Sequence, residues 1–76
     1  MNAARAKARM LELLDAQGSV TTRDLEHDIV LQAESPEDVR LAARELESDG
    51  VAIMLRETMA PRGLDFTGLV ANRARA

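Results

Sequence analysis

The side chains that could carry out catalysis or bind a metal are few in this sequence. Its 76 residues include one His, no Cys, no Tyr and no Trp. Asp24 and His27 lie three residues apart, the spacing of half a carboxylate–histidine metal site, but no further ligands accompany them. The serines fit no nucleophile motif, and there is no glycine-rich phosphate loop. We therefore predict no enzymatic activity, no metal, no cofactor and no small-molecule substrate, and we expect His27 to lie on the surface.

Arginine is the other side chain here with useful chemistry, because a guanidinium binds both phosphate and guanine. Arg40 and Arg44 are four residues apart, so they share one face of a helix. Arg56 and Arg62 flank a segment with Pro and Gly that is typical of a loop. The candidate DNA-binding residues are Arg40, Arg44, Arg56 and Arg62. The competing interpretation is a solvated helix face, on which Arg40 and Arg44 pair with Glu37 and Glu47.

The charge is distributed unevenly along the chain. Residues 1–19 contain three basic and two acidic residues (net +1), residues 20–50 three and nine (net −6), and residues 51–76 four and two (net +2). Carboxylates in the middle segment oppose DNA binding, because counterion release dominates affinity for a duplex. An acidic surface would instead attract a basic protein. The candidate residues for that protein contact are Glu34, Glu37 and Asp38, although a helix dipole accounts for the last two equally well.

Length and composition limit the chain to one small domain over residues 1–76. Without Cys, no disulfide or thiolate metal site can supplement its core. The longest apolar run, residues 51–55, is far shorter than the ~20 residues that span a bilayer, and no apolar stretch follows the basic N-terminus. We therefore expect a cytoplasmic protein with no membrane association. The single Phe provides no stacking platform for single-stranded nucleic acid.

Periodicity predicts a first helix over about residues 3–16. Leu11 and Leu14 lie on its expected apolar face, together with Ala4, and Met10 and Leu13 widen that face. Gly18 follows at the position where a left-handed residue ends a helix. Residues 19–21 are short and β-branched, and they could form a minimal strand.

Capping signals define the next two helices. Thr21 or Thr22 should cap the second helix, which we expect to end near residues 31–33. Ser35 is the expected N-cap of the third helix, with Pro at the first helical position and two acidic residues behind it. Gly50 should close that helix.

Beyond Gly50 the apolar period changes from 3.6 to 2, which predicts a strand with Val51, Ile53 and Leu55 on its buried face. After a loop over residues 57–63, residues 64–67 alternate again and should return antiparallel. Residues 69–76 are expected to be a last helical turn or a frayed tail. The predicted strand core is Val51, Ile53, Leu55, Leu64 and Phe66, facing Leu11, Leu14, Leu25, Ile29, Val39 and Leu46.

This order of elements resembles the winged helix-turn-helix superfamily, as found in small bacterial and phage regulators. The resemblance covers roughly residues 4–69. It is carried by residues 10–14, residues 18–25 and residues 35–51, in which Val39, Ala43, Leu46, Gly50 and Val51 fall where such domains place apolar residues and the Gly that opens the wing. It implies an α+β, mostly α fold: a three-helix bundle with a C-terminal two-stranded β-hairpin wing.

The resemblance also implies a function. Winged helices usually insert the third helix into the major groove and lay the hairpin loop against the backbone or the minor groove. The implied activity is that of a DNA-binding transcriptional regulator whose partner is duplex DNA, with Arg62 at the tip of the wing. The alternative is a winged-helix scaffold for protein–protein interaction through its acidic helix-turn-helix face. Homodimerisation is a further possibility, for which the candidate contact residues are Met10, Leu13, Met54 and Met59. For Met10 and Leu13 the competing interpretation is a place in the core.

Overall fold

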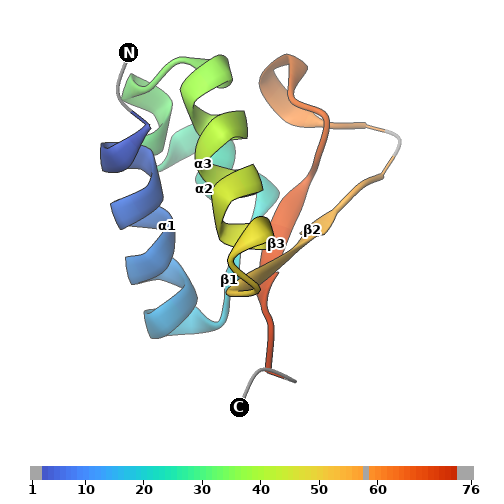
Figure 1. Cartoon of the computed structure of the whole chain (residues 1–76). Helices are drawn as coiled ribbons and strands as arrows, with labels where there is room; N and C mark the ends of the chain where they lie inside the picture. Colours follow the sequence, from blue (N-terminus) through green and yellow to red (C-terminus); the bar gives the residue numbers. More distant parts are fainter. Residues whose placement is uncertain (1–2, 58, 74–76) are drawn as a thin grey trace.

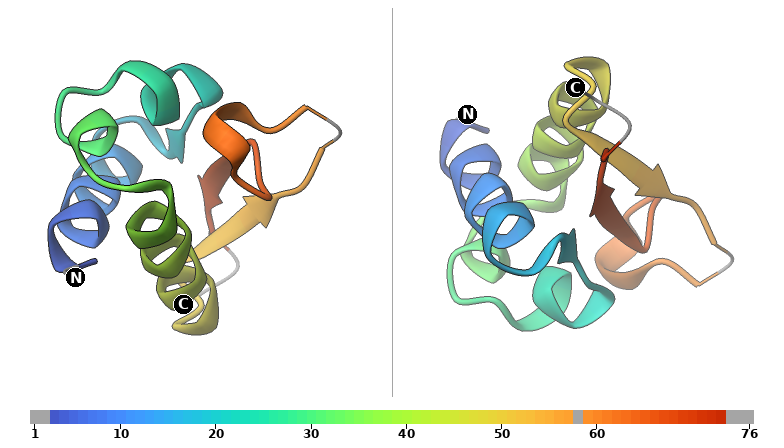
Figure 2. Two further views of the ribbon diagram at one scale, coloured as in Figure 1. Left: turned by 90° about the horizontal axis from the view of Figure 1, so that it is seen from above. Right: turned by 90° about the horizontal axis from the view of Figure 1, so that it is seen from below.

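Three α-helices and a three-stranded antiparallel sheet make up the described part of the chain (Figure 1). The computed structural model describes residues 3–57 and 59–73. The helices are α1 (Ala4–Gln17), α2 (Thr22–His27) and α3 (Pro36–Ser48), and the strands are β1 (Ser19–Val20), β2 (Ala52–Leu55) and β3 (Gly68–Ala71). Two short 3-10 turns, η1 (Leu31–Ala33) and η2 (Pro61–Gly63), lie in the connections. The fold is a small α+β domain, mostly helical. Seen from above and below, the helices gather on one side and β2 and β3 on the other (Figure 2).

The first helix is confirmed to within one residue at each end. Gly18 ends α1 in the left-handed conformation (φ 79°), and its N–H donates to the Leu14 carbonyl. The buried face consists of Ala6, Met10, Leu13 and Leu14. Leu11, which was expected to face the core, is exposed, so that expectation was wrong.

The predicted starts of α2 and α3 are confirmed by their caps. Thr21 Oγ1 accepts a hydrogen bond from the Asp24 N–H, and the Asp24 carboxylate accepts one from the Thr21 N–H, which completes a capping box. Ser35 Oγ likewise accepts from the Asp38 N–H. These interactions span three residues, so the sequence alone specifies them.

The second helix is shorter than expected, because it ends at His27 rather than near residues 31–33. Asp28 has an extended backbone (ψ 131°), and its Oδ2 accepts hydrogen bonds from the N–H groups of Val30 and Leu31. Those bonds take the place of continued helical bonds. As a consequence Ile29, which was expected in the core, is exposed.

The strand after Gly50 is present, but its buried face is the opposite of the expected one. Ala52 and Met54 are buried, whereas Ile53 is 47% exposed and Leu55 is also exposed. A shift of one residue exchanges the two faces of a strand. Since every residue from Val51 to Leu55 is apolar, no polar face was available to indicate the correct choice.

The sheet is larger than the predicted two-stranded hairpin. β3 lies at residues 68–71 rather than 64–67, and it pairs with both β1 and β2 in the order β1-β3-β2. Val20 is opposite Leu69, and Met54 is also opposite Leu69 from the other side. The predicted tail therefore contributes residues 69–71 to the central strand, and its residues 74–76 lie outside the described part of the chain.

The core lies between the helices and the sheet. Phe66 is fully buried, as expected of the only aromatic residue, and Leu64 is buried beside it although neither lies in a strand. Gly68 allows β1 to approach β3 closely, because a Cβ there would lie 2.7 Å from the Val20 carbonyl oxygen. None of the helices among residues 3–57 and 59–73 is long and apolar enough to cross a membrane.

Candidate nucleic-acid interface

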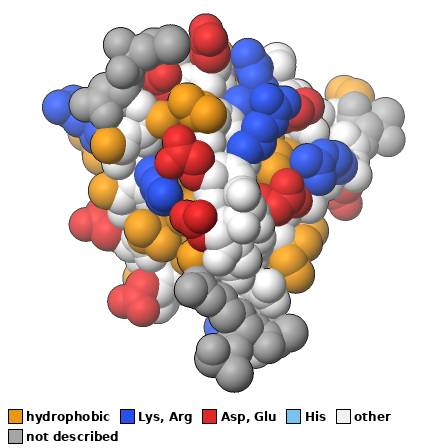
Figure 3. Space-filling model, viewed as in Figure 1, with side chains coloured by type: hydrophobic (Ala, Val, Ile, Leu, Met, Phe, Trp, Pro, Cys, Tyr) orange, Lys and Arg blue, Asp and Glu red, His pale blue; other side chains and the backbone are white. Residues whose placement is uncertain are grey.

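Two of the predicted arginines join α3 to the last residue of η2 and to the segment that follows it. Arg40 Nη1 donates to the Gly63 carbonyl at 3.3 Å, and Arg44 Nη2 lies 2.9 Å from Asp65 Oδ2. Figure 3 shows Lys and Arg side chains gathered over this side of α3, with Asp and Glu side chains among them. The exposed side of α3 and residues 63–65 therefore form one surface, which we call the arginine face.

The ion pair on the arginine face is open to solvent. The Arg44 and Asp65 side chains are 58% and 45% exposed. The hydrogen bond from Arg44 lowers the pKa of the Asp65 carboxyl below its ordinary value. Exposed pairs of this kind contribute about 0–1 kcal/mol to stability. A phosphate could thus replace Asp65 as the partner of Arg44 at little cost.

Arg56 reaches the same surface from the end of β2. Its Nη1 lies 3.5 Å from Glu47 Oε2 on α3, and its Nη2 donates to Met54 Sδ at 3.6 Å. The expected pairing of Glu47 with Arg40 or Arg44 is therefore wrong, because Glu47 pairs with Arg56 across the gap between α3 and β2. More than half of the Arg56 side chain remains exposed.

Arg62 does not lie at the tip of a wing, which corrects the sequence interpretation. Its side chain is partly buried and points back to the segment between α2 and α3. Nη1 donates to the carbonyls of Leu25 and Leu31, each at 3.0 Å, and Nη2 donates to the Glu34 carbonyl at 2.7 Å. The guanidinium thereby gives hydrogen bonds to three backbone carbonyls. They lie in the last turn of α2, in η1 and just before the N-cap of α3.

The backbone of Arg62 is also unusual. Its φ of 55° makes it the one non-glycine residue with positive φ in the described part of the chain. Such a conformation costs roughly 1–2 kcal/mol for a residue with a Cβ. Glycine would adopt it freely, so the three hydrogen bonds of the side chain are what favours arginine at this position.

The three acidic candidates do not form one surface. Glu37 is exposed and Glu34 is half-buried. Asp38 is only 8% exposed, and its Oδ1 is buried with no hydrogen-bond partner among residues 3–57 and 59–73. Among the described residues, Glu37 is therefore the only member of this set that could readily meet a protein from solution.

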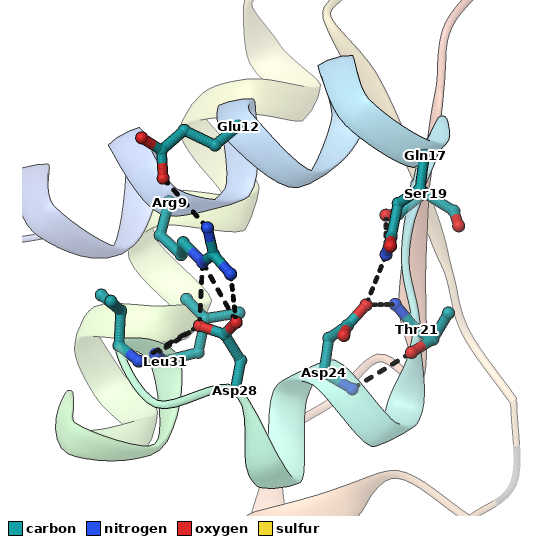
Figure 4. A network of polar contacts seen from close by, with 9 residues as sticks. Arg9, Glu12, Gln17, Ser19, Thr21, Asp24, Asp28 and Leu31 are labelled. Carbon is teal, nitrogen blue, oxygen red and sulfur yellow. Dashed lines mark hydrogen bonds and ion pairs between the residues drawn. The ribbon is translucent and has the colours of Figure 1, made fainter.

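One polar contact had no clear sequence signal. Arg9 on α1 forms an ion pair with Asp28, with Nη2 and Oδ1 at 2.7 Å, and it also contacts Glu12 (Figure 4). The Asp28 side chain is only 7% exposed. The hydrogen bond from Arg9 lowers the pKa of the Asp28 carboxyl. The two residues are nineteen positions apart, so helical spacing does not identify them as partners.

The exposed apolar side chains do not match the predicted dimer contacts. Met10, Leu13 and Met54 are all buried, whereas Met59 is 84% exposed. His27 is exposed on α2, as expected. No group of three His, Cys, Asp or Glu side chains that could hold a metal ion, and no pocket, is found among the described residues. Comparison with known protein families, curated proteins and solved structures finds no match to this chain.

Proposed function

We propose that this chain is a winged-helix protein that binds duplex DNA through its arginine face. The observation that supports this most directly is the joining of α3 to residues 63–65 by Arg40 and Arg44. Arg56, which follows β2 and pairs with Glu47 on α3, adds a guanidinium group from the β2–β3 connection to this surface. A helix of this kind fits the major groove, which is about 12 Å wide.

The order of elements supports the same proposal. A short strand before α2 pairs with the last strand, and α3 is followed directly by β2 and β3. In the resemblance to winged helices, α3 is the recognition helix and the connection between β2 and β3 is the wing. Arg44 is exposed on α3 and Arg40 is half-buried, whereas the neighbouring residues Val39 and Ala43 are buried.

The charge balance limits the affinity that we expect. Arg44 and Arg56 are each paired with a carboxylate in the absence of DNA. DNA must displace Asp65 and Glu47, and Glu37 remains near the start of α3. Each phosphate contact still releases counterions, so binding is expected to be weak to moderate and strongly salt-dependent. Removing Arg62 from the set leaves three arginines for direct contact: Arg40, Arg44 and Arg56.

The experiment is a fluorescence-anisotropy titration of a labelled random duplex with the full chain from about 50 to 200 mM salt. We expect saturable binding whose affinity falls linearly on logarithmic axes, with a slope near −2 to −3 for two to three phosphate contacts. Single-stranded DNA of the same sequence is the control, and we expect it to bind more weakly. An absence of duplex binding at the lowest salt would show the proposal to be wrong.

A scaffold for protein contact is the second candidate function. The observation favouring it is that α3 contains four acidic residues and only two arginines. Charge reversal by Glu37→Lys distinguishes the two functions, because Glu37 is exposed at the first turn of α3. It should strengthen DNA binding if DNA is the ligand, and it should abolish capture of a basic protein partner if protein is the ligand.

A further inference from the structure

The turn η2 contacts the helical part of the molecule from two sides. The Arg62 side chain donates hydrogen bonds to one carbonyl in α2 and to two carbonyls between α2 and α3. The carbonyl of the next residue, Gly63, accepts a hydrogen bond from Arg40 on α3. One turn of chain therefore fixes both the entry of α3 and one of its exposed arginines.

We propose that Arg62 is a positioning residue for DNA recognition: it sets the spacing between α3 and residues 63–65 without touching the DNA. This inference rests on the proposed function. The planar guanidinium supports it, because it offers donors in a fixed fork that determines the relative placement of the carbonyls it binds. The carbonyls of Leu25, Leu31 and Glu34 lie on the two sides of the turn between α2 and α3, so their separation governs where α3 begins.

The strained backbone of Arg62 is a second, independent observation. A left-handed conformation in a residue with a Cβ persists only where the surrounding structure compensates for it. Arg62 adopts this backbone conformation between Pro61 and Gly63. In the same conformation its side chain points toward the carbonyls of Leu25, Leu31 and Glu34. Both terminal nitrogens of Arg62 are thus engaged by carbonyls of the chain itself.

The test compares Arg62→Ala, Arg62→Lys and Arg44→Ala in the duplex titration, at a temperature where each variant is shown to be folded. We expect Arg62→Ala to weaken binding roughly 2- to 30-fold at every salt concentration, as for residues that act through coupling. The slope against salt should not change. Arg44→Ala should instead reduce the slope by about 0.9, since it removes a phosphate contact. Arg5→Ala, on the exposed side of α1, controls for the loss of one charge.

The lysine variant keeps the test informative if the alanine variant does not fold. An ammonium can still donate to carbonyls but lacks the fixed fork, so we expect an affinity between those of the wild type and Arg62→Ala. Backbone amide NMR signals of residues 25, 31, 34 and 63 should shift in Arg62→Lys. A structural role alone would move these signals and the stability, but it would leave the affinity of the folded protein unchanged.

The possible failures are distinct. If the wild-type chain does not bind duplex DNA, both the proposed function and the positioning role of Arg62 are wrong. If the wild type binds and folded Arg62→Ala binds equally well, only the positioning inference is wrong. If Arg62→Ala lowers the salt slope as Arg44→Ala does, Arg62 contacts phosphate directly and the inference is also overturned.

Discussion

Arg9 on α1 and Asp28 after α2 are joined by three hydrogen bonds: Arg9 Nη2 donates to Asp28 Oδ1 at 2.7 Å, and Arg9 Nε donates to Oδ1 at 3.0 Å and to Oδ2 at 3.1 Å. The same Oδ2 accepts the N–H groups of Val30 and Leu31. One carboxylate therefore anchors the connection between α2 and α3 to the first helix. Arg62 also binds that connection, through the carbonyls of Leu31 and Glu34.

Replacing Asp28 should separate its ion pair with Arg9 from its hydrogen bonds to the N–H groups of Val30 and Leu31. In Asp28→Ala the N–H groups of Val30 and Leu31 lose their acceptor, and we expect a loss of about 1–3 kcal/mol in the free energy of unfolding. In Asp28→Asn an amide oxygen can still accept these bonds, so the loss should be smaller. Chemical denaturation at neutral pH measures both. Equal stabilities for the two variants would contradict the role of the backbone bonds.

The stability difference between the wild type and Asp28→Asn should depend on pH. The Arg9 hydrogen bond lowers the pKa of Asp28 in the folded chain, so the folded state binds fewer protons than the unfolded state. The stabilisation is therefore complete above the ordinary Asp pKa of about 3.9, and it is lost as the pH falls through the lower folded value. Unfolding curves between about pH 2 and 7 should show the two proteins converging in acid. A difference that stays constant over this range would contradict the assignment.

Truncating Phe66 should be the most damaging single change. The side chain is fully buried and is the only aromatic ring in the chain. Phe66→Ala should cost about 3–5 kcal/mol, which is comparable with the whole stability of a small domain. Circular dichroism should show a largely unfolded chain, whereas Phe66→Leu should remain folded with a lower Tm. A stable Phe66→Ala protein would mean that the core is not centred on this ring.

Gly68→Ala should destabilise the pairing of β1 with β3. The added Cβ would lie 2.7 Å from the Val20 carbonyl oxygen, a backbone atom that cannot rotate away. We expect a cost of about 1–3 kcal/mol, as for other overpacked positions. Gly63→Ala is the matched control, because a Cβ there meets nothing within 4 Å and only its positive φ is penalised. Amide exchange in residues 19–20 should accelerate in Gly68→Ala but not in the control.

Arg44→Ala should weaken DNA binding without weakening the fold. Its ion pair with Asp65 is exposed, so we expect a stability change within about 0.5 kcal/mol. Binding to duplex DNA should fall, and the salt slope should decrease by about 0.9. Asp65→Asn is the complementary variant, and it should strengthen binding by freeing Arg44. An Asp65→Asn protein with weaker binding would argue against the arginine face.

The starts of α2 and α3 and the ends of α1 and α3 could be predicted from the sequence, because they depend on interactions within a few residues, whereas the end of α2 at His27 was missed. Thr21 and Ser35 cap helices by bonding to N–H groups three positions away, and Gly18 and Gly50 adopt the left-handed conformation that their own lack of a Cβ permits. These signals involve only residues that are close together in the sequence. The change of period after Gly50 likewise indicated a strand.

Tertiary structure decided which face of that strand is buried and where the arginines point. Residues 51–55 are apolar on both sides, so only packing against α3 selects Ala52 and Met54 for the interior. β1 joins the sheet by pairing with β3, whose residues are about fifty positions away in the sequence. Arg62 points inward because it binds backbone carbonyls that come together only in the folded chain. Interactions at such separation leave no periodic trace in the sequence, because they depend on distances in space rather than along the chain.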